Sequence, residues 1–227
     1  MSFITQVQKP LGSKKSLFAR CFQTDEQVFQ HVVPPQEIIQ KQSLIQPEMI
    51  NSTKKLLILD LDETLVHSSF QPVQNADLTL NLDILDPSGL TTKHTVFVYK
   101  RPFLEMYLLE MSKHYDLCVF TASLQVYCDA VMDAIDPNGL VKLRLYRNHC
   151  TMYNNMYIKN VYKLGYLPEN VIIVDNSPIS FSLQPENGIM CSAFYDDKSD
   201  TYLRDCIDYM IELSKCSDVR QLLKGSK

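Results

Sequence analysis

From residue 55 onward, short apolar runs alternate with segments of helical periodicity. The apolar runs predict strands over 55–59, 115–120, 143–146 and 171–174. Apolar positions three and four residues apart predict helices over 101–114, 123–135 and 201–214. This alternation of strands and helices is typical of α/β folds. We therefore expect a doubly wound, mainly parallel sheet with helices on both faces.

The pattern also predicts a hairpin and the buried face of one helix. Residues 78–85 and 92–99 alternate between apolar and polar positions, which predicts a β-hairpin with Asp86-Pro87-Ser88-Gly89 as its turn. The helix over 101–114 is expected to begin with Pro102, because proline suits a first helical position. Its buried face is then predicted to carry four apolar side chains: Phe103, Tyr107, Leu108 and Met111.

Residues 1–53 lack this periodicity. They are rich in glutamine and are interrupted by Pro34-Pro35, so we expect an arm that is ordered at most in part. The α/β domain is expected over 54–223, with a small β insertion over 70–98 and a short tail over 224–227. The insertion is too short to form an independent cap, since domains rarely have fewer than about 50 residues. An uncapped site would admit a side chain that protrudes from a polypeptide.

Composition narrows the class of protein. The 227 residues include 22 Lys and Arg against 26 Asp and Glu, a net charge of −4, which argues against direct binding to nucleic acid. No apolar run reaches the roughly 18–20 residues that cross a bilayer, so we expect no membrane partner. The 7 cysteines form no CxxC pair, and we expect reduced thiols in a nuclear or cytoplasmic monomer.

Three of the predicted strands end in a polar residue that can carry chemistry. Asp60, Thr121 and Asp175 each follow an apolar run directly. Ligands of open parallel sheets bind outside the carboxyl ends of the strands. If these strands are neighbours, the three side chains converge on one site.

Asp60 and Asp62 project to the same side of an extended segment. A carboxylate at Asp60 can attack a phosphorus atom, which divides hydrolysis of a phosphoester into phosphoryl transfer and hydrolysis of the aspartyl phosphate. Asp62 can protonate the leaving oxygen and then deprotonate the attacking water. These two residues therefore favour phosphoester hydrolysis.

Such a site needs positive charge. Asp175 and Asn176 offer hard oxygen ligands for Mg²⁺, with the Asp60 carboxylate and a main-chain carbonyl completing the set. A lysine must also reach the phosphoryl oxygens. Lys159 and Lys163 both lie in the appropriate interval, and the residues alone do not decide between them.

The segment Asp60-Leu61-Asp62-Glu63-Thr64 after an apolar strand resembles the first motif of the haloacid dehalogenase superfamily of aspartate-nucleophile phosphatases. The longer string DLDETLVHSSF, with KRPF, FTAS, YIK and VDNSP in that order, is similar to the small C-terminal-domain phosphatases. The resemblance covers about residues 54–223. It implies a haloacid dehalogenase-like core and a phosphoserine/threonine phosphatase that acts on the tail of RNA polymerase II or related phosphoproteins.

Carried over by position, the resemblance implies a catalytic set of Asp60, Asp62, Thr121 and Lys159. Asp60 is the implied nucleophile and Asp62 the implied general acid and base, while Thr121 and Lys159 hold the phosphoryl group. The implied Mg²⁺ ligands, direct or through water, are Asp60, the Asp62 carbonyl, Asp175 and Asn176.

The same resemblance implies a substrate-binding set. Thr64 would orient the first loop, Arg147 would face the substrate, and Ser123 belongs to the FTAS motif. A groove for a proline-containing peptide would be lined by Phe70, Leu124 and Tyr127. The chain departs from the family pattern at two positions: Asn160 replaces an Asp after the motif lysine, and Phe194 replaces a Trp.

Other functions remain open beside this interpretation. The chain could be a catalytically silent scaffold or transport component, although both Asp60 and Asp62 are present. It could instead be a phosphotransferase, a phosphatase of a different phosphoprotein, or one that acts on a smaller phosphoester. His149-Cys150 suggests a cysteine phosphatase, but that chemistry needs an arginine six positions after the cysteine, where Met156 stands.

Overall fold

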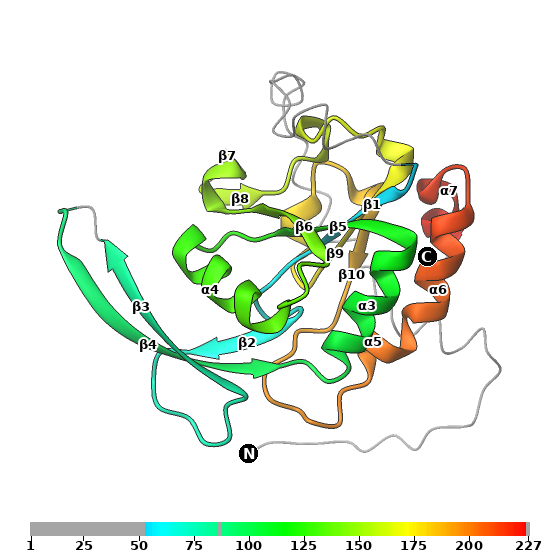
Figure 1. Ribbon diagram of the computed structural model, residues 1–227. Helices are drawn as coiled ribbons and strands as arrows, with labels where there is room; N and C mark the ends of the chain where they lie inside the picture. The colour runs from blue at the N-terminus through cyan, green and yellow to red at the C-terminus, as the bar shows by residue number, and fades with distance from the viewer. Residues whose placement is uncertain (1–52, 86–87, 226–227) are drawn as a thin grey trace, which may run out of the picture.

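The computed structural model describes residues 53–85 and 88–225 (Figure 1). A sheet of five parallel strands lies at its centre, in the order β10-β9-β1-β5-β6. These strands are β1 (Lys55–Leu59), β5 (Tyr115–Phe120), β6 (Val141–Leu145), β9 (Val171–Asp175) and β10 (Gly188–Met190). The expected α/β class with a mainly parallel sheet is confirmed. Apart from Thr53, the expected N-terminal arm lies outside the described residues.

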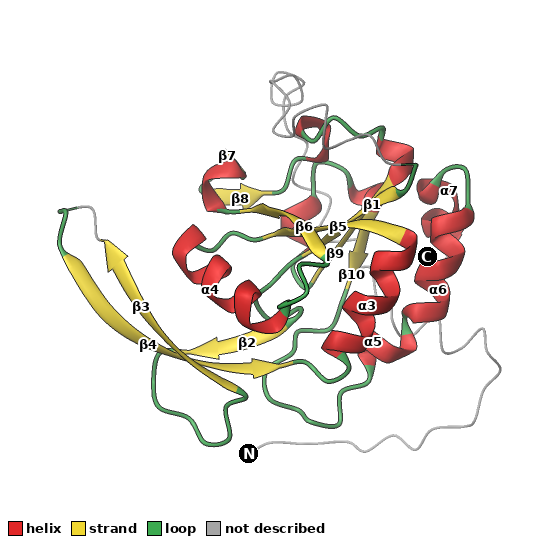
Figure 2. Cartoon of the chain, viewed as in Figure 1, coloured by secondary structure: helices red, strands yellow, loops and turns green. Residues whose placement is uncertain are grey.

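Successive side chains of a strand point to opposite faces of the sheet, and here a core cluster covers each face, so both faces are buried. Leu57 and Leu59 of β1 pack in one core cluster with the apolar faces of the longer helices, which are drawn in red in Figure 2. These helices are α3 (Leu104–His114), α4 (Gln125–Ile135) and α6 (Ile207–Lys215). Burial on both faces explains why the strands read as continuous apolar runs.

Leu56 and Ile58 point to the opposite face and pack in a second cluster with Val161 and Phe181. These partners belong to 3₁₀ helices, so this face is covered by short helical turns rather than by long helices. The 3₁₀ helices are η3 (Arg147–His149), η4 (Val161–Lys163), η5 (Pro168–Asn170), η6 (Pro178–Phe181) and η7 (Pro185–Asn187).

The prediction for the start of α3 was wrong. Phe103 has φ = 67°, in the left-handed region, and the helix begins after it at Leu104. Pro102 therefore precedes the helix, and Phe103 is 38% exposed instead of lying on the buried face. Tyr107, Leu108 and Met111 are buried as expected.

The helix predicted over 201–214 is two helices. α5 (Tyr202–Asp205) ends at Asp205, and α6 begins at Ile207 after the single residue Cys206. The first residues of the segment predicted over 123–135 are also not helical, because Leu124 is extended and α4 begins at Gln125. α7 (Val219–Gly225) ends the described chain and extends into the segment that we expected to be a tail.

A second, antiparallel sheet has the order β2-β4-β3. β3 (Leu78–Leu85) and β4 (Thr91–Lys100) form the predicted hairpin, although Asp86 and Pro87 of its turn lie outside the described residues. β2 (Val66–Ser69) was not predicted, and it joins this sheet to the loop after β1. The hairpin extends from the core while β3 contacts α4 (Figure 1).

A further hairpin, of β7 (Thr151–Tyr153) and β8 (Met156–Ile158), was also not predicted. Its two-residue turn is Asn154-Asn155, with φ of 47° and 61°. Asparagine is one of the few residues that tolerate positive φ, so this dipeptide was an available hairpin signal. The hairpin delivers the chain to Lys159.

In the part of the chain that the structure describes, no helix combines the length and apolar character that a bilayer crossing requires.

Arg101 joins the small sheet to the rest of the domain. Its guanidinium is buried and forms hydrogen bonds of 2.9 and 2.8 Å to both carboxylate oxygens of Asp200. It also donates to the main-chain carbonyl oxygens of Thr64 and Ser192, at 3.1 and 3.0 Å. Tyr202 lies against the guanidinium plane, 4.7 Å away. Arg101 therefore connects β4, the loop after β1 and the segment before α5.

We predict that Arg101→Met lowers the free energy of unfolding by about 3–5 kcal/mol, because it leaves the Asp200 carboxylate without its buried partner. Urea denaturation measures this loss. Lys113→Ala is the control, since Lys113 forms an exposed pair with Glu110, and it should leave the denaturation midpoint unchanged. Similar midpoints for Arg101→Met and the parent protein would contradict the prediction.

Candidate functional site

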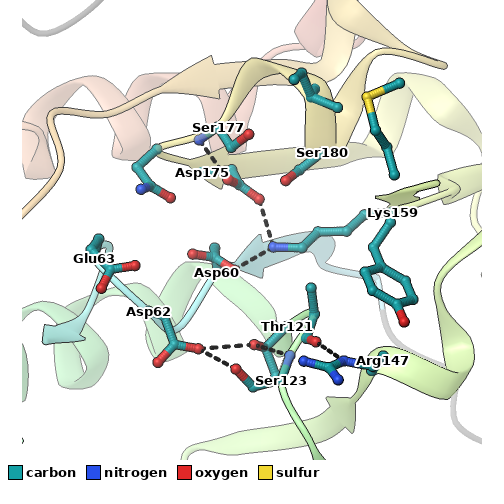
Figure 3. Close-up of a pocket in the computed structure, with 15 residues that line it drawn as sticks. Asp60, Asp62, Glu63, Thr121, Ser123, Arg147, Lys159, Asp175, Ser177 and Ser180 are labelled. Atoms are coloured by element: carbon teal, nitrogen blue, oxygen red, sulfur yellow. Dashed lines mark hydrogen bonds and ion pairs between the residues drawn. The ribbon is translucent and has the colours of Figure 1, made fainter. Parts of the chain in front are cut away.

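A cavity of about 590 Å³ opens at the carboxyl ends of β1, β5 and β9 (Figure 3). Eight of the residues predicted from the sequence line it together: Asp60, Asp62, Thr121, Ser123, Arg147, Lys159, Asp175 and Asn176. Strand order explains this convergence, because β1 lies between β5 and β9 in the sheet. The three strand ends predicted to meet do so.

Lys159 lies at the centre of the cavity floor. Its ammonium nitrogen is 2.5 Å from Oδ1 of Asp60 and 2.5 Å from Oδ2 of Asp175 (Figure 3). All three residues are buried, with Lys159 and Asp175 each only 1% exposed. The second oxygen of Asp175 accepts a 2.8 Å hydrogen bond from the Ser177 amide. One lysine thus holds two carboxylates in place.

The electrostatics of this cluster follow from its burial. Burial and the neighbouring Asp175 charge raise the pKa of Asp60 to about 7, although Lys159 acts in the opposite direction. Burial tends to lower the pKa of Lys159, but the charges of Asp175 and Asp60 outweigh it and raise the pKa above its ordinary value. Lys159 is therefore an ammonium ion at neutral pH.

Main-chain contacts fix the ends of this cluster. The Lys159 amide donates to the Ser180 carbonyl at 2.7 Å, and its own carbonyl accepts from the side chain of Gln184 at 2.6 Å. The Asp60 amide donates to the Val174 carbonyl at 3.0 Å, which continues the pairing of β1 with β9. The position of Lys159 is thus determined by the backbone as well as by its ion pairs.

Asp62 faces the opposite wall and has partners of a different kind. Oδ2 accepts hydrogen bonds from Ser123 at 2.6 Å and from Thr121 at 3.3 Å. Oδ1 accepts from the hydroxyl of Tyr127 at 2.5 Å, and that hydroxyl lies 2.6 Å from the Ser68 hydroxyl. The two carboxylates, two residues apart in sequence, therefore differ sharply in environment: Asp60 contacts a cation, while Asp62 contacts neutral hydroxyls.

A second pocket of about 210 Å³ adjoins the main cavity. It is mostly apolar and contains the three residues predicted for a peptide groove, Phe70, Leu124 and Tyr127, together with Ile84 of β3. Asp62, Ser123 and Arg147 line both spaces. The small antiparallel sheet therefore supplies one wall of this pocket through Ser68 and Ile84, which were not singled out from the sequence.

Two residues considered from the sequence, Thr64 and Lys163, line neither the main cavity nor the apolar pocket. Thr64 is fully buried behind it, with its hydroxyl 3.5 Å from the Cys191 sulfur and its carbonyl bound by Arg101. This location suits the expected orientation of the loop rather than direct contact with a substrate. Lys163 belongs to η4, outside the cavity, and the geometry separates it from Lys159.

Asn160 and Phe194, the two residues that depart from the family pattern, both make defined contacts in the structure. The Asn160 side chain caps η4 by accepting a 3.0 Å hydrogen bond from the Tyr162 amide. Lys159 keeps two anionic partners, Asp60 and Asp175, beside this asparagine. Phe194 is buried, and its amide donates to the Glu63 carbonyl at 2.7 Å. The aromatic position therefore still supports the loop after β1.

Some cavity residues were not singled out from the sequence. Tyr157 belongs to the YIK motif but was given no role of its own; it lines the cavity, and the Arg147 guanidinium lies 5.3 Å from its ring centre. Ser177 stands in the VDNSP motif, which was a usable signal, whereas Ser180 has no local signal. Glu63 also lines the cavity and pairs with His67 at 3.0 Å. His67 itself does not line the cavity.

The donor chemistry of the cavity suits a hard cation. Four carboxylates line it against two cationic side chains, a formal excess of two negative charges. The oxygen atoms of Asp60, Asp175 and Asn176 are the ligand type that Mg²⁺ prefers. Within residues 53–85 and 88–225, no three His, Cys, Asp or Glu side chains already form a metal cluster. A ligand set here would therefore combine two carboxylates with amide and carbonyl oxygens.

The family model and three relatives that match this chain are all named as phosphatases. A family model described as NLI interacting factor-like phosphatase matches residues 55–220. The "Probable C-terminal domain small phosphatase" of Dictyostelium discoideum is 42% identical over 173 residues, which cover 76% of this chain and 55% of the relative. The mouse "CTD small phosphatase-like protein" is 39% identical over 192 residues, covering 85% of this chain and 68% of the relative.

The human "Carboxy-terminal domain RNA polymerase II polypeptide A small phosphatase 1" is 38% identical over 174 residues, covering 77% of this chain and 65% of the relative. The chain thus spans between 55% and 68% of the length of these curated relatives.

A solved structure of the fission yeast RNA polymerase II CTD phosphatase Fcp1, bound to beryllium fluoride, superposes with a TM-score of 0.53 at 17% identity. The match covers 76% of this chain and 54% of the other, and at this identity it shows a common fold. Fold, motif order and sequence relatives agree. The chain belongs to the NLI interacting factor-like phosphatases, the family of the C-terminal-domain small phosphatases within the haloacid dehalogenase superfamily.

Proposed function

We propose that the chain is a Mg²⁺-dependent phosphoprotein serine/threonine phosphatase that acts through an aspartyl phosphate. The observation that carries this proposal is the pairing of two carboxylates with different partners in one open cavity. Asp60 is held by the ammonium group of Lys159, while Asp62 is held by hydroxyl groups on the facing wall. A nucleophile and a proton-transfer group need these two contrasting environments.

The reaction has two steps. A carboxylate oxygen of Asp60 attacks phosphorus and forms the aspartyl phosphate, while the bond from phosphorus to the serine oxygen breaks. The proton of Asp62 passes to that leaving oxygen. A water molecule then gives a proton back to Asp62 and attacks phosphorus, which breaks the bond to Asp60 and releases phosphate. Lys159 and Thr121 hold the phosphoryl oxygens throughout.

The residues that would hold Mg²⁺ are Asp60, Asp175, Asn176 and the main-chain carbonyl of Asp62. Bound there, the cation would supply the positive charge that offsets repulsion between the carboxylates and the incoming phosphate. The excess of two negative charges around the cavity supports this proposal, because a phosphomonoester itself carries about −1.5 to −2 charges at neutral pH.

The substrate proposed is a phosphoserine in an extended peptide with a nearby proline. The apolar pocket beside the cavity, with Phe70 and Leu124, and the exposed Arg147 at their boundary support a peptide rather than a small phosphoester. The human and fission yeast relatives are named for the RNA polymerase II C-terminal domain. We extend that substrate class to this chain, with nuclear or cytoplasmic location, a monomeric state and no nucleic-acid contact as further predictions.

Asp60→Asn should abolish turnover of a phosphoserine peptide, because an amide cannot attack phosphorus as a carboxylate does. Phosphate release measures the effect, and circular dichroism checks that the fold survives. Asp208→Asn, on the exposed surface of α6, is the matched control and should turn over like the parent. Residual activity of about a tenth of the parent rate or more would refute Asp60 as nucleophile.

Chelation of divalent cations should stop phosphate release, and added Mg²⁺ should restore it, because the acidic cavity repels an unscreened phosphate. Full activity in excess chelator would refute metal dependence. Binding of Mg²⁺ alone, followed by calorimetry on the parent and on Asp175→Asn, gives a readout without turnover. The variant should bind Mg²⁺ more weakly than the parent.

A phosphoserine-proline peptide should have a kcat/KM at least roughly tenfold above that of free phosphoserine, equivalent to about 1.4 kcal/mol of transition-state binding. Proline lowers the entropic cost of binding, since its φ is already fixed. Phe70→Ala should reduce this ratio, whereas Leu167→Ala, an exposed apolar residue away from both spaces, should preserve it. Equal kcat/KM for the peptide and the free amino acid would contradict the peptide proposal.

A further inference from the structure

Three polar groups form a chain beneath the apolar pocket. Ser68 of β2 lies 2.6 Å from the hydroxyl of Tyr127 on α4, and Tyr127 donates at 2.5 Å to Oδ1 of Asp62. Tyr127 is 59 residues from Ser68 and 65 residues from Asp62 in sequence, and it belongs to α4, which contacts β3 of the small sheet. A hydroxyl chain thus connects the small antiparallel sheet with a carboxylate of the main cavity.

Tyr127 contacts both spaces at once. Tyr127 lines the apolar pocket with Phe70 and Leu124, while its hydroxyl donates to Asp62, which lines the main cavity. Burial and the nearby Asp62 charge raise the pKa of Tyr127 well above its ordinary value, so it remains a neutral phenol and a hydrogen-bond donor. A side chain that fills the pocket would therefore contact the same residue whose hydroxyl orients Asp62.

We propose that Tyr127 is a positioning residue for Asp62 and that the hydroxyl pair Ser68–Tyr127 links peptide binding in the apolar pocket to proton transfer. This inference rests on the proposed phosphatase function. It gives Tyr127 a role beyond the groove, and it gives Ser68 a role that the motif pattern did not indicate.

The geometry explains why Tyr127 matters for orientation. Ser123 and Thr121 both donate to Oδ2 of Asp62, whereas Tyr127 donates to Oδ1. Bonds to both oxygens fix the plane of a carboxyl group, while bonds to one oxygen leave rotation about its axis. A phenol can also accept a hydrogen bond. A protonated carboxyl group keeps one acceptor oxygen, so Tyr127 can go on donating to Oδ1 of Asp62 while Oδ2 carries the proton destined for the leaving oxygen.

Tyr127→Phe separates the two roles, because it keeps the ring and removes only the hydroxyl. The measurement is kcat/KM for a phosphoserine-proline peptide and for an aryl phosphate with an activated phenol. This parameter reports steps up to phosphoryl transfer, so hydrolysis of the intermediate does not obscure it. The peptide value should fall by about tenfold or more, with little change in KM. The aryl phosphate should lose less than about threefold, since its leaving group needs no proton.

Ser68→Ala tests the chain itself. We expect a smaller loss with the peptide in the parent background and no additional loss in the Tyr127→Phe background, because residues that act through one contact are not additive. Tyr146→Phe is the matched control: Tyr146 also donates to an aspartate, Asp129, at 2.7 Å, but that aspartate lies outside the cavity. This control should retain the parent values with both substrates.

Equal losses on both substrates, or no loss with the peptide, would overturn the positioning role while leaving Asp60→Asn to judge the phosphatase itself. A structural readout needs no turnover. Crystal structures of the parent and Tyr127→Phe should show one conformer of Asp62 in the parent and a rotated or mixed carboxyl group in the variant. The same single conformer in both would also overturn the proposal.

Discussion

The buried ammonium group of Lys159 is the interaction on which the site depends. Removing an ion from water costs on the order of several kcal/mol, and only close opposite charge with further hydrogen bonds offsets that cost. Asp60 and Asp175 provide the charge, and Ser180 and Gln184 hold the backbone on either side. Because Asp60 follows β1 and Asp175 ends β9, the ion pairs also fix the ends of two neighbouring strands.

Two carboxylates that are almost adjacent in sequence acquire different chemistry from their partners alone. Asp60 points to a charged neighbour, and its contact is a pair of opposite ions. Asp62 points to Ser123, Thr121 and Tyr127, which can each donate or accept a hydrogen bond. This difference comes from the elements that face each residue. The loop after β8 faces Asp60, and the segment from the end of β5 into α4 faces Asp62.

The strand ends were predictable because an apolar run followed by a polar residue is a local signal. Asp60, Thr121 and Asp175 were therefore identified before their convergence was seen. The choice between Lys159 and Lys163 was not local, since it depends on how η4 turns away after Asn160. The resemblance to the phosphatase family selected Lys159, and Lys159 is the lysine of the two that lines the cavity.

Other features depended on backbone conformation or on packing between distant segments. The predicted start of α3 was wrong because Phe103 adopts a positive φ, which a pattern of apolar residues does not reveal. The hairpin of β7 and β8 was missed, although Asn154-Asn155 was a signal for its turn. The contact of Tyr127 with Asp62 spans 65 residues and depends on the packing of α4, so no local pattern could predict it.

The two spaces beside Asp62 share a wall, and this fixes the spacing at which a ligand can occupy both. The phosphoryl group would sit by Asp60, and an apolar side chain would sit by Phe70, with Arg147 and Ser123 between them. An extended chain advances about 3.3–3.6 Å per residue. Adding or deleting one residue between the phosphorylated side chain and its apolar neighbour would therefore move that neighbour out of register. The protein would then discriminate between ligands by the distance between the phosphoryl group and the apolar side chain, as well as by the chemical nature of each.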